Sequence, residues 1–171
     1  MKNLIFASLA FFAMSGCAST YEQHVVTNPA SKLNVGSSIL IATPADGAYG
    51  DEKYPGSGLA TATAVRSAFA RYSDNIAVSA DCKDFECLNK GQATSYDYYV
   101  VPQILNWVDR ATEWSGKKDT IEIKVTVYDA KDGKSLSSNV ISGKSKWATF
   151  GGDHPQDLLP EPLNDYIKSL Y

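Results

Sequence analysis

Hydrophobic and polar positions alternate most regularly over residues 121–128 of this chain. Apolar residues occupy the odd-numbered positions from Ile121 to Val127, which predicts a strand with one buried and one solvent-facing side. The Asp132-Gly133 pair that follows is typical of a two-residue hairpin turn, so we expect an antiparallel partner over residues 136–148. Residues 96–108 are rich in strand formers and complete a predicted antiparallel meander, in which Pro102 implies an edge position or a bulge.

Short apolar runs and a helical pattern alternate in the first half of the chain. Residues 38–42 and 76–78 are predicted to be short buried strands. Between them, an N-cap at Ser57 opens a predicted amphipathic helix. Its apolar positions recur at helical spacing: Leu59, Ala62, Val65, Phe69 and Tyr72. A brief second helix is predicted to start at Asp81 to Asp84 and to run through Leu88.

The C-terminal segment carries the signals of a helix start. Asp153 stands at the expected N-cap, Pro155 in the first turn and Gln156 at the capping-box position. Pro160 and Pro162 are expected to divide this helix in two. The predicted order is β-α-β-α-β-β-β-α. Right-handed crossovers would fold it into an α/β sandwich with a mixed five-stranded sheet and helices mainly on one face.

The chain begins with a short apolar run that ends in a cysteine. Lys2 precedes mostly apolar residues from Leu4 to Met14, and Ser15-Gly16 stand directly before Cys17. The run is shorter than the roughly 20 residues that span a bilayer. It resembles the bacterial lipobox, which implies cleavage after residue 16 and acylation of Cys17; an ordinary secretory signal cut nearby is the alternative. We therefore predict three parts: a signal peptide (1–16), an acylated cysteine with a flexible tether (17–36) and a single α/β domain (37–171).

The residues after Cys17 and the overall charge bear on location and partners. In lipoproteins of the enterobacterial type, an Asp after the cysteine retains the protein at the inner membrane. Ala18 and Ser19 stand there instead, which implies the periplasmic face of the outer membrane. The formal net charge of -3 and the pI near 5.3 argue against nucleic-acid binding, and no polybasic segment is present. We expect membrane contact through the lipid at Cys17 alone, and neither a cofactor nor a metal.

Two cysteines are left for the folded domain, Cys82 and Cys87. An even count in an oxidising compartment predicts a disulfide between them. At this spacing, the bridge requires that the turn from Lys83 to Glu86 is not a regular helix. A metal site would need further ligands nearby, a redox pair favours the spacing C-x-x-C, and two free buried thiols are the third alternative.

Two segments, residues 106–116 and 144–152, place tryptophan beside charged residues near the ends of predicted strands. If those strands are neighbours, the segments share one end of the sheet, where aromatic faces beside polar groups suit a sugar, a peptide or a partner protein. The candidate binding surface comprises Asp109, Arg110, Glu113, Trp114, Lys146, Trp147, Asp153 and His154. In the alternative interpretation, Trp107 and Trp147 pack in the core, the charged residues form ion pairs that fix loops, and the residues around His154 cap a helix.

The sequence resembles a bacterial lipoprotein family known only as a domain of unknown function, number 4823. The resemblance covers roughly residues 38–160, and its signature stretches are Tyr49-Gly50, Tyr54 to Gly58, Asp109 to Gly116 and Lys144 to Asp157. It implies an envelope lipoprotein of Gram-negative bacteria with no established activity, cofactor or catalytic residue. The order of elements is also similar to the amino-terminal domain of the Tol translocation protein and to curli-secretion lipoproteins, an analogy of fold only.

These observations favour a non-enzymatic binding or assembly module of the cell envelope, with an unknown protein or glycan partner. The alternative is a glycan-processing or metal-assisted enzyme that uses Asp109, Glu113 or His154, and a structural component without a small ligand is the third possibility. Gly56-Ser57-Gly58 opens a helix, but no third glycine or Lys-Ser/Thr pair follows, which argues against a phosphate site. Ser57 also lacks the spacing of a serine-hydrolase elbow, so no catalytic residue is predicted.

Overall fold

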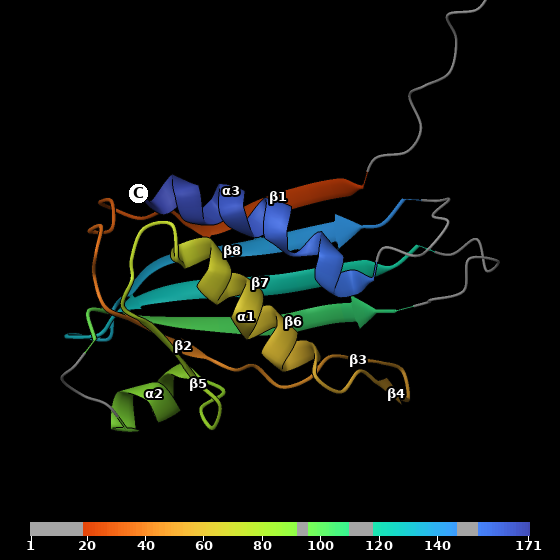
Figure 1. The fold of residues 1–171 in the computed structure, drawn as a ribbon, viewed down its shortest axis with the longest axis horizontal. Helices are drawn as coiled ribbons and strands as arrows, with labels where there is room; N and C mark the ends of the chain where they lie inside the picture. The colour runs from red at the N-terminus through yellow and green to blue at the C-terminus, as the bar shows by residue number, and fades with distance from the viewer. Residues whose placement is uncertain (1–18, 92–95, 110–117, 147–153) are drawn as a thin grey trace, which may run out of the picture.

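Figure 1 shows a six-stranded mixed sheet with helices packed on it, in a computed structural model that describes residues 19–91, 96–109, 118–146 and 154–171. The strands lie in the order β1-β8-β7-β6-β2-β5. Their bounds are β1 Thr20–Thr27, β2 Ile39–Ala42, β5 Ile76–Ser79, β6 Tyr98–Val108, β7 Thr120–Asp129 and β8 Ser135–Lys144. The helices are α1 Ser57–Phe69, α2 Phe85–Gly91, the 3-10 helix η1 Pro155–Leu158 and α3 Pro160–Leu170, and a separate small hairpin joins β3 Ala48–Tyr49 to β4 Glu52–Lys53.

Strands β6, β7 and β8 form the antiparallel meander that the alternation predicts. Gly133, in the turn between β7 and β8, has a φ of 72°, in the left-handed region that glycine adopts without strain. The apolar residues of β7 are buried, whereas Glu122 and Lys124 on its other face are half-buried. β8 ends at Lys144, so the predicted strand over 136–148 was too long at its C-terminus.

The sheet has one strand more than the sequence predicted. Residues Thr20–Thr27, expected to lie in the tether, form β1 and pair antiparallel with β8, from Thr20 opposite Lys144 to Thr27 opposite Ser138. Nearly every residue of β1 is exposed, so no hydrophobic alternation marked the strand. Its backbone pairs with the edge of β8, and that pairing is invisible in local sequence. The prediction of five strands is therefore wrong, as is the flexible tether over residues 17–36 where β1 occupies it.

The crossovers place helices on both faces of the sheet. α1 connects β2 to β5, and α2 leads from β5 back across β2 to β6. The chain moves across the sheet in opposite directions in these two connections, so right-handed crossovers put α1 and α2 on opposite faces. α2 covers only a corner, where Leu88 packs with Leu40, Tyr99 and Val101.

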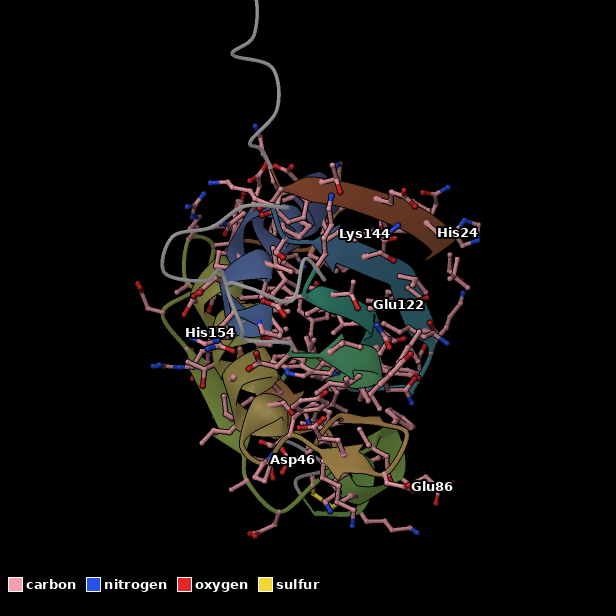
Figure 2. The ribbon with its side chains drawn as sticks, turned by 90° about the vertical axis from the view of Figure 1, so that its right-hand side faces the viewer. His24, Asp46, Glu86, Glu122, Lys144 and His154 are labelled. Carbon is pink, nitrogen blue, oxygen red and sulfur yellow. A yellow bond between two sulfur atoms is a disulfide. The ribbon has the colours of Figure 1, made fainter. Side chains whose placement is uncertain are left out.

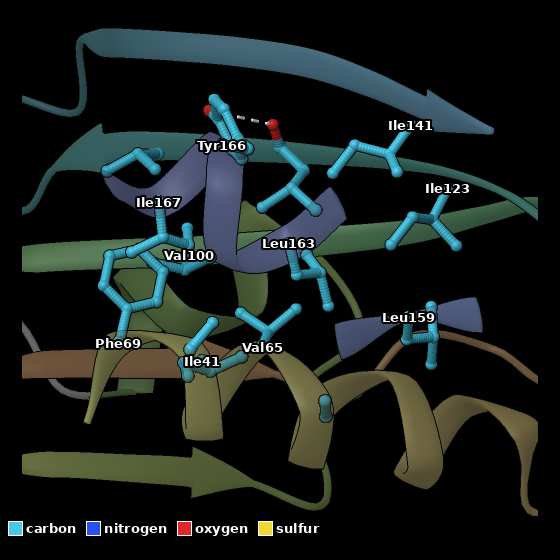
Figure 3. Packing of buried hydrophobic residues seen from close by; sticks show 14 of the residues in the cluster. Ile41, Val65, Phe69, Val100, Ile123, Ile141, Leu159, Leu163, Tyr166 and Ile167 are labelled. Carbon is cyan, nitrogen blue, oxygen red and sulfur yellow. Dashed lines mark hydrogen bonds between the residues drawn. The ribbon is translucent and has the colours of Figure 1, made fainter. Parts of the chain in front are cut away.

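The main core lies between the sheet and the layer made by α1, η1 and α3. Figure 3 shows side chains from both layers meeting there. Labelled members are Ile41, Val65, Phe69, Val100, Ile123, Ile141, Leu159, Leu163, Tyr166 and Ile167. Of the four helical elements in the described ranges, three therefore cover one face, in agreement with the prediction of helices mainly on one side.

Pro102 lies in β6, an interior strand, but its missing N–H leaves no backbone carbonyl of a neighbouring strand without a partner. β2 pairs with β6 only over Tyr98–Val100, so beyond Val100 that side of β6 has no ladder to complete. On the other side, Pro102 lies opposite Val125 of β7, and the register shifts between Ile104 and Asn106. At Pro102, β6 is therefore an edge strand on its β2 side, as predicted. The irregularity between Ile104 and Asn106 is the predicted bulge.

The C-terminal helical segment is divided, as the prolines predict. η1 ends at Leu158, and α3 begins at Pro160. Pro160 and Pro162 both lie in the first turn of α3, where a missing backbone N–H costs no intrahelical hydrogen bond.

Cys82 and Cys87 form the predicted disulfide, with their Cα atoms 5.3 Å apart. Cys82 precedes α2, which begins at Phe85, so the bridge spans the start of the helix and not a regular turn. The Asp84 carboxylate accepts a hydrogen bond from the backbone N–H of Cys87 at 2.9 Å and caps this short helix.

Candidate functional site

One end of the sheet gathers most of the described candidate residues. β6 ends at Val108 opposite Thr120 of β7, and Thr120 lies opposite Lys144 at the end of β8. The two tryptophan-containing segments therefore leave the same end of the sheet, as expected. Figure 2 looks onto this end, with His154 on the helix-covered side and Lys144 and Glu122 toward the open face of the sheet.

Asp109 and His154 form the one pair of predicted site residues that the described part of the chain brings into contact. Nδ1 of His154 lies 3.6 Å from a carboxylate oxygen of Asp109, and both side chains are partly exposed. Asp109 directly follows β6, while His154 directly precedes η1, so residues 45 positions apart in sequence meet here. A protonated His154 would form a partly solvated ion pair with Asp109.

His154 also opens the final helical segment. Its backbone N–H donates to the carboxylate of Asp157 at 3.0 Å, and the Asp157 N–H donates to the His154 carbonyl at 2.9 Å. The predicted cap is thus shifted by one residue, with His154 in the place expected for Asp153 and Asp157 in the place expected for Gln156. Capping accounts for the backbone of this segment, and the imidazole is left to contact Asp109.

Trp107 follows the alternative interpretation and packs in the core. It is 3% exposed, and a Cβ built on Gly47 would lie 2.5 Å from its Cβ atom. This close approach holds the loop between β2 and β3 against β6. A glycine followed by a short polar loop carries no signal of such contact, so the sequence did not predict it.

The sequence also did not predict a buried pair of hydrogen bonds between Asp119, just before β7, and Ser145, just after β8, which we call the Asp119–Ser145 clip. The Asp119 N–H donates to Oγ of Ser145, and the Ser145 N–H donates to the Asp119 carbonyl, each at 2.9 Å. Both residues are buried, and Lys146 follows directly, half-buried. The clip fixes where Lys146 leaves the sheet.

The other candidates lie outside the described residues: Cys17, Arg110, Glu113, Trp114, Trp147 and Asp153. The contacts that the alternative interpretations assign to them remain predictions. Among the residues that are described, no three His, Cys, Asp or Glu side chains come together to hold a metal ion. Within the same ranges, no helix is long and apolar enough to cross a membrane.

The N-terminus of α1 is closed by the protein's own carboxylate. Oδ1 of Asp46 accepts a hydrogen bond from the N–H of Gly58 at 2.8 Å, and Oγ of Ser57 accepts one from Gly47 at 2.8 Å while donating to the Tyr54 carbonyl. The N-cap is Gly56, not Ser57 as predicted, because the serine hydroxyl bonds the preceding loop. An anion at this helix start would have to displace Asp46, which agrees with the absence of a phosphate-loop pattern.

An open groove of about 600 Å³ runs between α1 and α3. Its lining includes small residues such as Ala60, Ala64 and Ser67, together with the polar residues Arg71 and Asn164. It contains none of the candidate site residues.

Comparison with known proteins identifies a family and a fold. The family described as Domain of unknown function (DUF4823) matches residues 31–170. A search of curated proteins finds no match. The chain is similar to PelC from Paraburkholderia phytofirmans, described as a dodecamer, with a TM-score of 0.66 and 10% identity over 90% of this chain and 97% of PelC.

A second solved structure shares the fold. It is the protein XCC0632 from Xanthomonas campestris, of family DUF330, with a TM-score of 0.53 and 14% identity over 85% of this chain and 90% of that one. The similarity is thus to these proteins and not specifically to the amino-terminal domain of the Tol translocation protein. At such identities it establishes a common fold alone.

Proposed function

The chain belongs to the family described as Domain of unknown function (DUF4823), and on that premise we propose that it is a lipoprotein anchored through Cys17 to the periplasmic face of the outer membrane. The observation that carries this proposal is the position of Cys17, directly after Ser15-Gly16 and an apolar run too short to span a bilayer. The Cys82–Cys87 disulfide supports an oxidising compartment such as the periplasm.

Metabolic labelling tests the anchor. Cells that express the protein are grown with an alkyne analogue of palmitate, and their membranes are separated by density. We expect label in the outer-membrane fraction for the wild-type protein and none for Cys17→Ser, which should be recovered as a soluble periplasmic protein. Cys82→Ser serves as the matched control and should keep the label. An unlabelled wild-type protein would refute the anchor.

The anchored domain acts as a binding or assembly module. Two observations support this part of the proposal: the chain shares its fold with PelC, which is described as a dodecamer, and β1 and β5 leave two strand edges at the sides of the sheet. Light scattering on the Cys17→Ser protein purified from the periplasm should give a defined oligomer. A monomer at every concentration would leave binding of a different molecule as the role of the domain.

Photo-crosslinking identifies that partner directly. A crosslinking amino acid at position 114 or 147 should capture one envelope component in cells, because these positions belong to the segments that leave the sheet beside Asp109 and Lys146. The same residue at position 134, in the turn at the opposite end, is the control. Equal capture from both ends would argue against a binding surface at 114 and 147.

One observation favours the metal-assisted alternative, namely the contact between Asp109 and His154. A carboxylate and an imidazole at 3.6 Å supply two ligands, which hold Zn²⁺ tightly only if further ligands join them. Titration of the protein with zinc, monitored by calorimetry, distinguishes the two functions. Zinc binding that His154→Ala abolishes would support the metal-assisted enzyme. If the wild-type protein binds no zinc, the result would favour the non-enzymatic binding module.

A further inference from the structure

We propose that the end of the sheet where β1 begins lies against the lipid headgroups of the membrane that holds the anchor. This inference rests on the proposed acylation of Cys17. It gives the domain an orientation and assigns Lys118, Lys144 and Lys146 to anionic phospholipid, so a partner captured from positions 114 and 147 would contact the domain beside the membrane surface. In Figure 1 this is the end at which β6 and β8 terminate, opposite the C-terminus of the chain.

The first step is the pairing of β1. Thr20 lies opposite Lys144, Lys144 opposite Thr120, and Thr120 opposite Val108, so the first residue of β1 stands in one row with the ends of three other strands. The direction of β1 is fixed by its antiparallel register with β8. The chain must therefore enter the sheet at this end.

The second step is the length of the connection. Thr20 is three residues after Cys17, and three residues extend over at most roughly 11 Å. A flexible segment over residues 17–36 would have reached about 25 Å and left the domain free to turn. With β1 in the sheet, the row that contains Thr20 stays within a short distance of the acylated cysteine. The far end of β1, seven residues along at Thr27, lies about 23 Å from that row.

The third step is the charge around the point of entry. Lys144 is exposed and directly opposite Thr20, while Lys118 precedes β7 and Lys146 follows β8. Within the described ranges, no carboxylate forms an ion pair with these lysines: the nearby Asp109 contacts His154, Asp119 is buried, and Glu22 and Glu122 lie opposite Ser142, two residues farther from this end of the sheet. A lysine close to an anionic membrane contributes about 1 kcal/mol to attraction, a roughly fivefold change in affinity. Lys144 and Lys146 come from the end of β8 and Lys118 from the start of β7, so the pairing of the two strands brings the three together.

Apolar exposure does not distinguish the two ends. Tyr49 and Leu105 lie toward the proposed membrane side, but toward the other side Val25 and Val26 are similarly exposed and Val35 is more exposed. The anchor point and the lysines decide the orientation, and the exposed apolar residues provide matched positions for a test.

Quenching by nitroxide lipids measures the orientation. The full acylated protein is purified from membranes, labelled with a fluorophore at Leu105→Cys or at Val35→Cys, and inserted into vesicles of phosphatidylethanolamine and phosphatidylglycerol with headgroup nitroxides. Both native residues are large, apolar and at least half exposed, at 51% and 74%. We expect quenching several-fold stronger at position 105 than at position 35. Equal quenching, or stronger quenching at position 35, would overturn the orientation.

The charge is tested in the same vesicles. Lys144→Gln with Lys146→Gln should reduce the quenching at position 105, whereas Lys131→Gln with Lys134→Gln, at the opposite end, should leave it unchanged. An equal effect of both pairs, or of neither, would refute the assignment of the lysines to lipid.

Intact mass of the same preparation separates this inference from the proposed function. If acyl chains are present and quenching does not favour position 105, the orientation is wrong and the anchor stands. If the purified wild-type protein carries no acyl chains, both proposals fail.

Discussion

At the scale of single residues, a polar contact in the loop before α1 brings the backbone of Gly58 close to that of Pro44. The N–H of Gly58 donates to Asp46, and this geometry brings the Gly58 Cα so near the Pro44 carbonyl that an added Cβ would lie 2.2 Å from that oxygen. No side chain fits there. The residue that satisfies the start of α1 is twelve positions away, which is why the sequence assigned the cap to the adjacent Ser57.

Gly58→Ala should therefore destabilise the protein, although alanine ordinarily favours a helix over glycine. We expect a loss of about 1–3 kcal/mol in the free energy of unfolding, because the Pro44 loop must move and the contact with Asp46 weakens. Urea denaturation measures the change. Ser67→Ala, on an exposed turn of α1, should change the stability by no more than about 0.5 kcal/mol. A stabilised Gly58→Ala protein would contradict the packing.

Tyr166 makes stability depend on alkaline pH. Burial raises the pKa of its phenol to about 12, against a smaller opposing effect of the hydrogen bond with Ser137. In the unfolded chain the Tyr166 phenol ionises near pH 10. Its contribution to the free energy of unfolding is therefore fully present below pH 10 and is lost between about pH 10 and 12.

We expect the free energy of unfolding, measured in urea, to fall between about pH 10 and pH 12. Tyr166→Phe should show a smaller fall, although it is less stable than wild type at pH 8 because the hydrogen bond to Ser137 is lost. Burial also raises the pKa of Tyr171 to about 12, so part of the pH dependence should remain in this variant. An unchanged pH dependence in Tyr166→Phe would refute the assignment.

At the scale of elements, polar side-chain contacts help to attach β1, beside the packing of Tyr21 against the core. Gln23 lies on the helix-facing side of β1, where Asn139 of β8 donates to its Oε1 at 3.0 Å and its Nε2 donates to the Pro162 carbonyl of α3 at 3.3 Å. One glutamine thus joins an edge strand to its neighbour and to the helix above it.

Gln23→Ala should destabilise the protein by about 1–3 kcal/mol, because Asn139 is 1% exposed and would lose the acceptor of its amide N–H. Amide hydrogen exchange should show the loss concentrated in β1 and the C-terminal half of β8. Glu22→Ala, on the other face of β1, should leave exchange in β8 at the wild-type rate.

The disulfide stabilises the junction between β5 and α2. The carbonyl of Cys82 accepts the N–H of Thr43 after β2 at 2.9 Å, so the bridge also holds the end of the second strand. Closing so short a loop contributes about 2 kcal/mol. Reduction should lower the thermal midpoint of the wild-type protein, while the Cys82→Ser/Cys87→Ser protein should have that lower midpoint with or without reductant.

At the scale of the whole molecule, the described elements share one main core. Residues from β2, α1, the meander, η1 and α3 all belong to it, and the stacked rings of Tyr72 and Tyr171, 4.2 Å apart, join the segment after α1 to the C-terminus. Nothing in this arrangement separates into two independently packed halves.

The domain should therefore unfold in a single transition. Far-UV circular dichroism reports the sheet and helices, and tryptophan fluorescence reports the surroundings of the buried Trp107. Their denaturation curves should coincide for the Cys17→Ser protein. Two separated transitions would show that β1 or the α2 corner unfolds independently.

Local chemistry made several features predictable from the sequence alone. The alternation over 121–128, the Asp132-Gly133 turn, the divided C-terminal helix and the pair of cysteines each depend on residues close together in the chain, where periodicity, backbone preference and spacing act directly. The leader predicted over residues 1–16 is a signal of the same kind and stays a prediction, whereas the α/β class, which follows from the order of these elements, is confirmed.

Only the tertiary structure decided which distant segments meet. β1 shows no hydrophobic alternation, Asp46 reaches a helix twelve residues away, His154 meets Asp109 across 45 positions, and Lys118 at the start of β7 joins Lys144 and Lys146 at the end of β8. Backbone pairing, capping at a distance and charge clustering arise from through-space proximity, which leaves no periodic trace in the sequence. For that reason the sequence could predict an anchored domain, while the proposal about which end faces the membrane needed the register of its first strand.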